Sequence, residues 1–260
     1  MGPEKRCPAP AAKRTANRVL RGEDISNSLP EMLCSATLRR AFVAASLVVV
    51  SAFPVSAVQA TNGSAEGRAG LLMMPGQAIR NRNPISVNAV TALNIIMRTE
   101  NIEDPTYLAM RQKVSDLVAA QMSLDSVKLH KAWSRSSRDH QIAVLTALTQ
   151  LDVRYVVGKE SPYVHVDCSG LLWLAWRAAG VDMPRQAVSQ LDRRMRVERD
   201  KAVAGDIVGE GTHVHIYLGV GRAMVHAPFN GKSVRLKMMS EAQYNRVVWA
   251  NPSNIATYRL

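Results

Sequence analysis

An apolar run, SGLLWLAWRAA at residues 169–179, constrains the fold of this chain more than any other feature. Because the run is apolar on nearly every face at helical spacing, it is typical of a helix that is buried on all sides. Gly180 follows at the position where helices commonly end, and Cys168 stands directly before the run. The sequence therefore predicts a central buried helix that begins at a cysteine.

Short strands are predicted on the C-terminal side of this helix, because Gly and Asn interrupt stretches of β-branched residues there. The expected strands lie within residues 207–208, 213–220, 222–227 and 232–239. The expected turns lie at residues 209–211, 219–222 and 230–231. A buried helix followed by such a meander predicts an α+β fold, in which the helix packs on an antiparallel sheet.

The segment before the helix divides into three parts. Residues 61–86 carry Gly, Asn, Pro and Ser without periodicity, which predicts a flexible linker. Residues 87–136 carry apolar residues at helical spacing, with Pro105 suited to the first turn of a second helix. We expect this helical region to precede a domain at residues 137–260, which would begin with a further helix near residues 141–151.

The N-terminal part of the chain is predicted to be an export signal. An uncharged run at residues 41–53 follows Arg39 and Arg40. The run is shorter than the roughly 20 residues needed to cross a bilayer, but it suits the apolar core of a signal peptide. We expect cleavage after Ala60, with an uncleaved membrane anchor as the alternative. The mature protein is therefore expected to be exported to the cell wall, the periplasm or the extracellular space.

The first residues are unusual for such a signal. Residues 1–31 are long, polar and rich in Pro, Lys and Arg, whereas Met32 begins a compact signal of conventional layout. Translation is thus expected to start at Met32, or else residues 1–60 form a signal peptide with an extended leader. Contact with a membrane is expected only through this segment during export.

The charge of the chain bears on its partners. It carries 33 Lys and Arg against 21 Asp and Glu, and removal of residues 1–60 would leave a net charge of +8. A pI of about 10.1 would suit nucleic-acid binding, but export and the lack of a recognisable nucleic-acid motif argue against it. A positively charged exported protein instead suits an anionic cell envelope.

Cys168 is the candidate nucleophile. Cleavage of the signal would remove Cys7 and Cys34, which leaves Cys168 without an intrachain disulfide partner. A helix N-terminus offers free backbone N–H groups and the positive end of the dipole, so we expect a lowered pKa for this thiol. The same N–H groups suit the oxyanion that forms when a thiolate attacks an amide carbonyl.

Three histidines in predicted strands are candidate bases. His213 and His215 are two residues apart, so their side chains share one face of the sheet, and His226 falls on the next strand. One imidazole would take the proton from the thiol, and a second would orient the first. From the spacing alone three interpretations stay open: catalysis, a metal site with three nitrogen ligands, and plain packing.

Beyond these single residues, longer blocks of the sequence carry a family resemblance. The blocks are RYVVG at 154–158, DCSGLLWLAWRAAG at 167–180, MPRQ at 183–186, AGDIV at 204–208, HVHIYLG at 213–219 and MVHAP at 224–228. In this order they resemble the NlpC-type family of cell-wall cysteine peptidases. The resemblance implies a compact papain-like domain, in which a nucleophile helix packs on an antiparallel sheet, preceded here by the small helical region.

The resemblance also implies roles for individual residues. Cys168 falls on the family's nucleophile, His213 on its base, and His226 on the residue that orients the base. The positions that help the family to bind the free amine end of a stem peptide are Tyr155, Asp167 and Ser169. The implied activity is hydrolysis of peptidoglycan stem peptides between the γ-carboxyl of D-glutamate and a diamino acid. No metal and no organic cofactor is implied.

Some positions depart from the family's pattern. Val157 and Lys159 stand where the family has an aromatic residue and a second glycine, and Gln186 replaces a hydroxyl residue. His215 replaces a glycine that follows the base, and we expect it to pack or to contact substrate. The basic stretch at residues 232–237 is expected to form a solvated face.

Three other functions fit the same residues. An amidase or a transpeptidase would use the same framework, and product analysis separates these from an endopeptidase. A non-catalytic cell-wall-binding module would leave Cys168 without a chemical role. A metal-binding protein would use the histidines, which elemental analysis tests.

Overall fold

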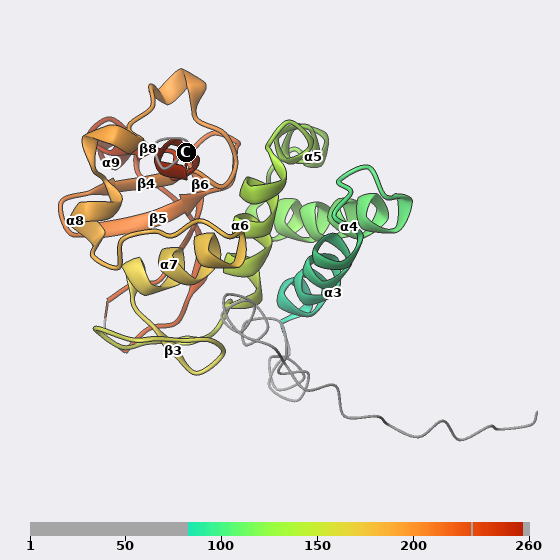
Figure 1. The fold of residues 1–260 in the computed structure, drawn as a ribbon, viewed down its shortest axis with the longest axis horizontal. Coiled ribbons are helices and arrows are strands. Elements are labelled where there is room, and N and C mark those ends of the chain that lie inside the picture. Colours follow the sequence, from blue (N-terminus) through green and yellow to red (C-terminus); the bar gives the residue numbers. More distant parts are fainter. Residues whose placement is uncertain (1–82, 230, 257–260) are drawn as a thin grey trace, which may run out of the picture. The chain divides into compact units, whose positions relative to one another are not determined.

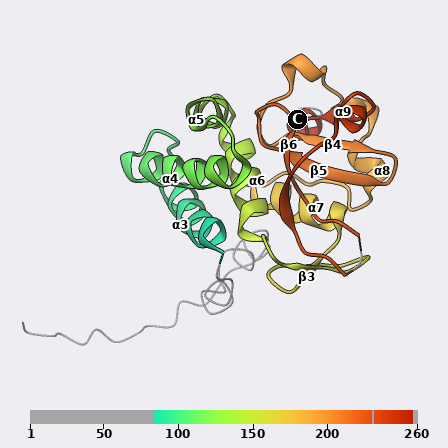
Figure 2. The same ribbon diagram turned by 180° about the vertical axis from the view of Figure 1, so that it is seen from behind.

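The computed structural model describes residues 83–229 and 231–256 (Figure 1). The predicted signal peptide, its cleavage site, the start at Met32 and most of the predicted linker lie outside these residues. Within them, no helix combines the length and the apolar character needed to cross a bilayer. Helices α3 to α5 lie on one side of α6, and α7 and the larger sheet lie on the other, as both views show (Figures 1 and 2).

Four helices form the N-terminal part of the described chain. Their bounds are α3 Pro84–Thr99, α4 Pro105–Met122, α5 Ser126–Ser134 and α6 Arg138–Thr149. The side chains that accept a backbone N–H at the starts of these helices belong to Asn83, Asp104, Asp125 and Ser137. The helical region is thus present as predicted. It begins three residues before residue 87, because Asn83 caps a helix whose first residue is proline.

Helix α6 joins the helical region to the rest of the fold. Residues 140–149 of α6 are all buried. Ser86 of α3 donates its hydroxyl to the carbonyl of Leu148 at 2.9 Å, which ties the two helices together. One apolar cluster extends from Ile85 to Ala250 and includes residues of α3, α6, α7 and the sheet. The domain start expected at residue 137 therefore lies inside a continuous core.

Helix α7, Cys168–Ala178, is the predicted buried helix. Asp167 caps its start, and its side chain accepts the N–H of Gly170. Gly180 follows the end with a φ of 88°, a left-handed conformation that glycine adopts at little cost. Trp176 is completely buried. The prediction of a buried helix with a cysteine at its first residue is confirmed.

The larger sheet is an antiparallel meander with one added strand. Its order is β7-β6-β5-β4-β8. The strands are β4 Ile207–Glu210, β5 His213–Tyr217, β6 Ala223–His226, β7 Arg235–Met238 and β8 Val248–Ala250. The first four confirm the predicted meander and the α+β fold class. Strand β8 pairs with β4 at the edge and was not predicted.

The hairpin between β4 and β5 differs from the prediction. Glu210 still belongs to β4 and pairs with His213, so the turn is Gly211-Thr212 and not residues 209–211. Gly211 has the positive φ of 59° that a two-residue hairpin turn needs. A Cβ on Gly209 would lie only 2.7 Å from the carbonyl oxygen of His213. That glycine therefore marks a close approach of two strands rather than a turn.

The remaining elements surround α7 and the sheet. A small sheet of order β1-β3-β2 contains β1 Arg154–Tyr155, β2 Glu160–Ser161 and β3 His165–Val166. Short helices are α8 Ala187–Gln190, α9 Glu241–Tyr244 and α10 Ser253–Ala256, with single 3-10 turns at Arg193–Met195 and Arg199–Lys201. The small sheet leads directly into Asp167 and so fixes the chain at the start of α7.

The two faces of the larger sheet have different environments. Val214 and Ile216 of β5 belong to the apolar cluster that contains α7. Tyr217 belongs to a second, smaller cluster with Val208, Met224, Met239 and Trp249. Because side chains alternate along a strand, His213 and His215 lie on the face of Tyr217, away from α7. The histidines and the interior of α7 therefore occupy opposite faces of the sheet.

Candidate active site

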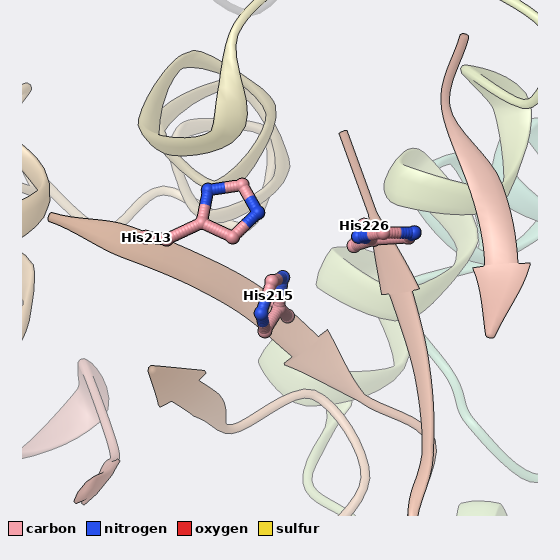
Figure 3. Close-up of side chains that lie close together, drawn as sticks. All are labelled: His213, His215 and His226. Atoms are coloured by element: carbon pink, nitrogen blue, oxygen red, sulfur yellow. The ribbon is translucent and has the colours of Figure 1, made fainter. Parts of the chain in front are cut away.

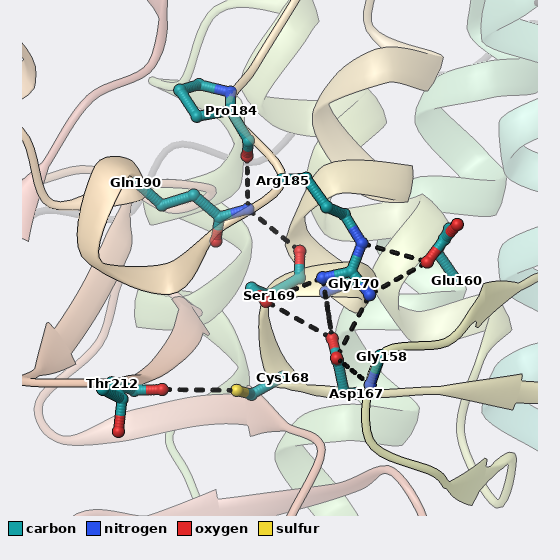
Figure 4. A network of polar contacts seen from close by, with 10 residues as sticks. All are labelled: Gly158, Glu160, Asp167, Cys168, Ser169, Gly170, Pro184, Arg185, Gln190 and Thr212. Atoms are coloured by element: carbon teal, nitrogen blue, oxygen red, sulfur yellow. Dashed lines mark hydrogen bonds and ion pairs between the residues drawn. The ribbon is translucent and has the colours of Figure 1, made fainter.

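Cys168 lies at the edge of strand β5. Its side chain is buried, and Sγ contacts the carbonyl oxygen of Thr212 at 3.7 Å (Figure 4). Within the described chain, β5 pairs with β6 at Ile216 and Tyr217, which leaves its first half unpaired on that side. The thiol occupies this open edge, directly beside the backbone that carries His213.

The protein environment raises the pKa of the Cys168 thiol. Burial is the largest cause, and the negative charge of Asp167 acts in the same direction. The backbone N–H groups of Val214 and Ser169 oppose this by favouring the thiolate, but they do not outweigh burial. The expected lowering of this pKa at the helix start is therefore wrong, because removal of the sulfur from water dominates.

Asp167 accepts hydrogen bonds from residues on both sides of Cys168 in the sequence. Its Oδ1 accepts the N–H of Gly170 at 2.6 Å, and its Oδ2 accepts the N–H of Gly158 at 2.7 Å. The hydroxyl of Ser169 also donates to Oδ1 at 3.3 Å. The carboxylate thus fixes the start of α7 against the loop that follows β1 (Figure 4).

Arg185 completes this network. Its guanidinium forms an ion pair with Asp167 at 3.1 Å and with Glu160 at 2.9 Å. It also donates to the hydroxyl of Ser169 at 2.8 Å. The sequence placed Arg185 within the MPRQ block but gave it no role, and Glu160 was missed entirely. The block was the available signal, since a planar guanidinium suits bidentate binding of carboxylates.

Tyr155 lies beside the thiol. Burial raises its pKa to about 12, and a hydrogen bond with Cys168 and the negative charges of Cys168 and Asp167 act in the same direction. The structure therefore brings Tyr155, Asp167 and Ser169 together around Cys168. The carboxylate oxygens of Asp167 already accept protein donors there, so an incoming amine would compete with Arg185.

Gln190 is a further residue that the sequence did not single out. It is completely buried, and its Nε2 donates to the carbonyls of Ser169 at 2.9 Å and Pro184 at 2.8 Å. This side chain connects the first turn of α7 to the segment that carries Arg185 (Figure 4). No local pattern marks a glutamine as a bridge between two backbone carbonyls.

His213, His215 and His226 form a cluster between β5 and β6 (Figure 3). The ring centroids of His213 and His215 are 4.6 Å apart, and those of His215 and His226 are 5.4 Å apart. His213 and His226 are farther apart, at 6.3 Å. The predicted juxtaposition of the three rings is therefore present, with His215 between the other two.

The surroundings of the cluster favour neutral imidazoles. Burial is the largest cause of a lowered pKa for all three rings, and the positive charge of Lys237 adds to it. The pKa of His226 falls to about 3, and that of His215 falls well below its ordinary value. All three rings are consequently neutral near pH 7 and retain a nitrogen lone pair.

The hydrogen bonds of the cluster lead away from the thiol. Arg235 donates from Nε to Nε2 of His226 at 3.3 Å, and Gln243 lies 3.3 Å from Nε2 of His215. His213 stacks on Phe229, with a centroid distance of 4.9 Å. In the part of the chain that the structure describes, no hydrogen bond joins His213 to Cys168 or to His226.

The three histidines also offer a donor set for a metal ion. One nitrogen from each ring lies within 4.8 Å of the others. Imidazole nitrogens suit zinc and other transition metals. Nε2 of His226, however, accepts from Arg235, and positive side chains surround the cluster. The ring positions therefore permit metal ligation, while the local charge opposes it.

Comparisons with known proteins agree with the family resemblance of the region that contains Cys168 and the three histidines. Residues 152–251 match the model of the NlpC/P60 family. The chain is 34% identical over 92 residues to gamma-D-glutamyl-L-lysine dipeptidyl-peptidase from Bacillus subtilis, a match that covers 32% of this chain and 31% of that protein. It is 29% identical over 127 residues to murein DD-endopeptidase MepH from Escherichia coli, covering 45% of this chain and 46% of that protein.

A solved structure of the same family also matches. RipD from Mycobacterium tuberculosis, described as a non-catalytic NlpC/p60 domain protein, aligns with a TM-score of 0.37 at 20% identity, and the match covers 45% of this chain and 98% of that one. The chain spans less than half the length of the two curated relatives, at 31% and 46%. Residues 152–251, with the buried helix and the antiparallel sheet, form a domain of the NlpC/P60 family.

Proposed function

We propose that this chain is a peptidoglycan hydrolase that cleaves an amide bond of stem peptides, with Cys168 as nucleophile and His213 as base. The observation that carries the proposal is the 3.7 Å contact between Sγ of Cys168 and the carbonyl oxygen of Thr212. Because Thr212 directly precedes His213, this contact places the thiol beside the stretch of strand β5 that carries the imidazole. The names of the two curated relatives, both peptidases, agree with this class of reaction.

The proposed reaction begins with a neutral pair. Since the pKa of the thiol is raised and that of His213 is lowered, the proton rests on sulfur before substrate binds. His213 takes this proton as Cys168 attacks the amide carbonyl. The backbone N–H groups at the first turn of α7 stabilise the oxyanion. His213 then protonates the leaving amine, and a water molecule that it activates releases the acyl group from sulfur.

The residue that orients His213 is proposed to be His226, which falls on the family's third position. Its Nε2 is engaged by Arg235, so the orienting contact would use Nδ1. His215 is the second candidate, because its ring is nearer to His213 and its buried Nδ1 has no hydrogen-bond partner. A larger loss of kcat in His226→Ala than in His215→Gly would support His226, and the reverse order would favour His215.

The proposed bond lies between the γ-carboxyl of D-glutamate and the diamino acid. The name of the Bacillus subtilis relative specifies a γ-D-glutamyl linkage, which supports this choice. The name of MepH specifies a DD-endopeptidase, so relatives of this chain differ in the bond they cut. Action outside the cytoplasm follows from this substrate, and the positive charge of the chain suits the anionic envelope.

The test is digestion of purified peptidoglycan and of a defined stem tetrapeptide with the full chain, beside Cys168→Ala, with products identified by mass spectrometry. We expect a cut at the γ-D-glutamyl bond that is absent with Cys168→Ala. Cleavage that persists in this variant would contradict the nucleophile. Cleavage at another bond would contradict the proposed substrate site. Wall binding without any product would favour the non-catalytic alternative.

A further inference from the structure

A cavity of about 240 Å³ lies beside the histidine cluster, and all three imidazole rings line it. Its polar lining comes from His213, His215, His226, Lys232, Arg235, Lys237 and Gln243. Lys232, Arg235 and Lys237 of the basic stretch at residues 232–237 are exposed, as expected of a solvated face, and they also line this cavity. We call this space the basic cavity.

The register of β6 and β7 explains why these positive side chains meet the histidines. His226 pairs with Arg235, and Met224 pairs with Lys237. Side chains of directly paired residues lie on the same face of a sheet. Arg235 and Lys237 thus project on the face that carries the histidine rings, and Arg235 contacts His226 at 3.3 Å.

The lining of the basic cavity is suited to negative charge. Lysine and arginine side chains only donate hydrogen bonds, and no aspartate or glutamate lines the cavity. Within residues 83–229 and 231–256, none of Lys232, Arg235 and Lys237 forms an ion pair with a carboxylate of the chain. In addition, His215 is only 1% exposed, and its Nδ1 has no hydrogen-bond partner within the described residues.

The cavity adjoins the proposed base. His213 is part of its wall, and the carbonyl of Lys232 accepts the N–H of Tyr155, the residue beside the thiol, at 2.8 Å. In the proposed mechanism His213 must reach the leaving amine. In that mechanism, the part of the substrate that carries this amine lies next to the basic cavity, because His213 lines it.

We propose that the basic cavity binds a carboxylate of the substrate on the leaving-amine side of the cleaved bond. The assignment to a substrate rests on the proposed function, whereas the binding of a small oxyanion does not. Stem-peptide residues that follow the cleaved amide end in carboxylates, and three cations with a glutamine amide match such a group. Inorganic phosphate presents the same kind of oxygen and serves as a probe.

A metal ion fits these residues less well than an anion. Three positive side chains would repel a divalent cation, and Nε2 of His226 and Nε2 of His215 already have neighbouring nitrogen donors. An anion instead attracts these cations and can accept from them directly. The two ligand classes give opposite results in the experiment below.

The first arm measures binding without catalysis. The full chain with Cys168→Ala is titrated with inorganic phosphate and with citrate, and the ring proton signals of the histidines are followed by NMR. We expect saturable shifts of these signals, and a Kd raised about tenfold in the double variant Lys232→Gln/Lys237→Gln. The matched control is Lys113→Gln, because Lys113 is exposed on α4, and it should leave the Kd unchanged.

Two results of this arm would overturn the proposal. One is the absence of phosphate and citrate binding, or binding that the double variant does not weaken. The other is saturable binding of zinc to the histidines with no response to phosphate. Either result stands whether or not the chain cleaves peptidoglycan, so failure of the cavity proposal is distinguishable from failure of the proposed function.

The second arm tests the source of the anion. Two stem tetrapeptides are compared, one with a free carboxylate on the leaving side and one with a carboxamide there. We expect a KM about tenfold lower for the carboxylate, with kcat similar, and loss of this preference in Lys232→Gln/Lys237→Gln. Equal KM values for the two peptides, with phosphate binding intact, would overturn the assignment to the substrate.

Discussion

Arg185 forms an ion pair with Asp167, the residue directly before the candidate nucleophile, at 3.1 Å. The same guanidinium bonds Glu160 and the hydroxyl of Ser169. This arrangement gives Asp167 a structural role beside the substrate-binding role that the family resemblance implies. It neutralises a carboxylate that caps α7, and so maintains the position of Cys168 relative to β5.

Removal of this guanidinium should destabilise the protein. Arg185→Met leaves the nearly buried carboxylate of Asp167 without its charged partner, and we expect a loss of about 2 kcal/mol in the free energy of unfolding. Urea unfolding followed by circular dichroism measures this loss. Arg194→Met is the matched control, because Arg194 forms only an exposed ion pair with Asp192. Equal stability of the two variants would contradict a structural role for Arg185.

The thiol should react slowly near neutral pH. Burial raises the pKa of Cys168, so the rate of alkylation by iodoacetamide should keep rising above the ordinary pKa of cysteine. Asp167→Asn removes a negative charge that contributes to this rise, while asparagine can still cap the helix. The midpoint of the rate profile should therefore move to lower pH in this variant. A wild-type midpoint near pH 7 would show that the helix start, and not burial, dominates.

Local patterns predicted the elements of the site but not its contacts. The apolar run before Gly180 was sufficient to predict α7, and the two-residue spacing of His213 and His215 was sufficient to place them on one face. Gly209 was misassigned to a turn because a glycine that allows two strands to approach looks the same in sequence. Only the register of the hairpin, Glu210 with His213, distinguishes the two cases.

The charge environment was the least predictable property. The raised pKa of Cys168 depends on how completely neighbouring elements bury the sulfur, which no local sequence pattern records. The role of Lys237 depends on its pairing with Met224, which sets the face of β7 on which it lies. Arg185 and Glu160 are 25 positions apart in the chain, and their ion pair arises only from the fold.

Acid should weaken the fold through His226. Its pKa is about 3 in the folded protein and near 6.5 when exposed, so between these values the unfolded chain binds a proton that the folded one does not. The contribution of neutral His226 to the free energy of unfolding is thus fully present above about pH 6.5 and is lost as the pH falls toward 3. The loss is on the order of 2 kcal/mol by pH 4.5. Urea unfolding at pH 7 and pH 4.5 measures the difference, which should shrink in His226→Gln. An unchanged difference in that variant would assign the loss to other groups.

The helical region should belong to the same cooperative unit as the candidate active site. Ile96 of α3 is completely buried in the cluster that also contains α7, and the side chain of Arg138 in α6 donates to its carbonyl at 3.1 Å. Ile96→Ala should therefore lower the free energy of unfolding by about 3 kcal/mol, and hydrogen exchange should accelerate in α7 as well as in α3. Val127→Ala is the control, because Val127 is 73% exposed on α5.

The same packing bears on whether residues 87–136 act only as a removable cover of the candidate active site. A fragment of residues 137–260 would expose the face of α6 that packs against α3. We therefore expect the fragment to lose its cooperative thermal transition. It should also hydrolyse stem peptides no faster than the full chain. Thermal melting and product analysis of the fragment beside the full chain measure both properties. A fragment that melts cooperatively and cleaves faster would mean that helices α3 to α5 restrict access to Cys168 and are not needed for the hydrophobic core.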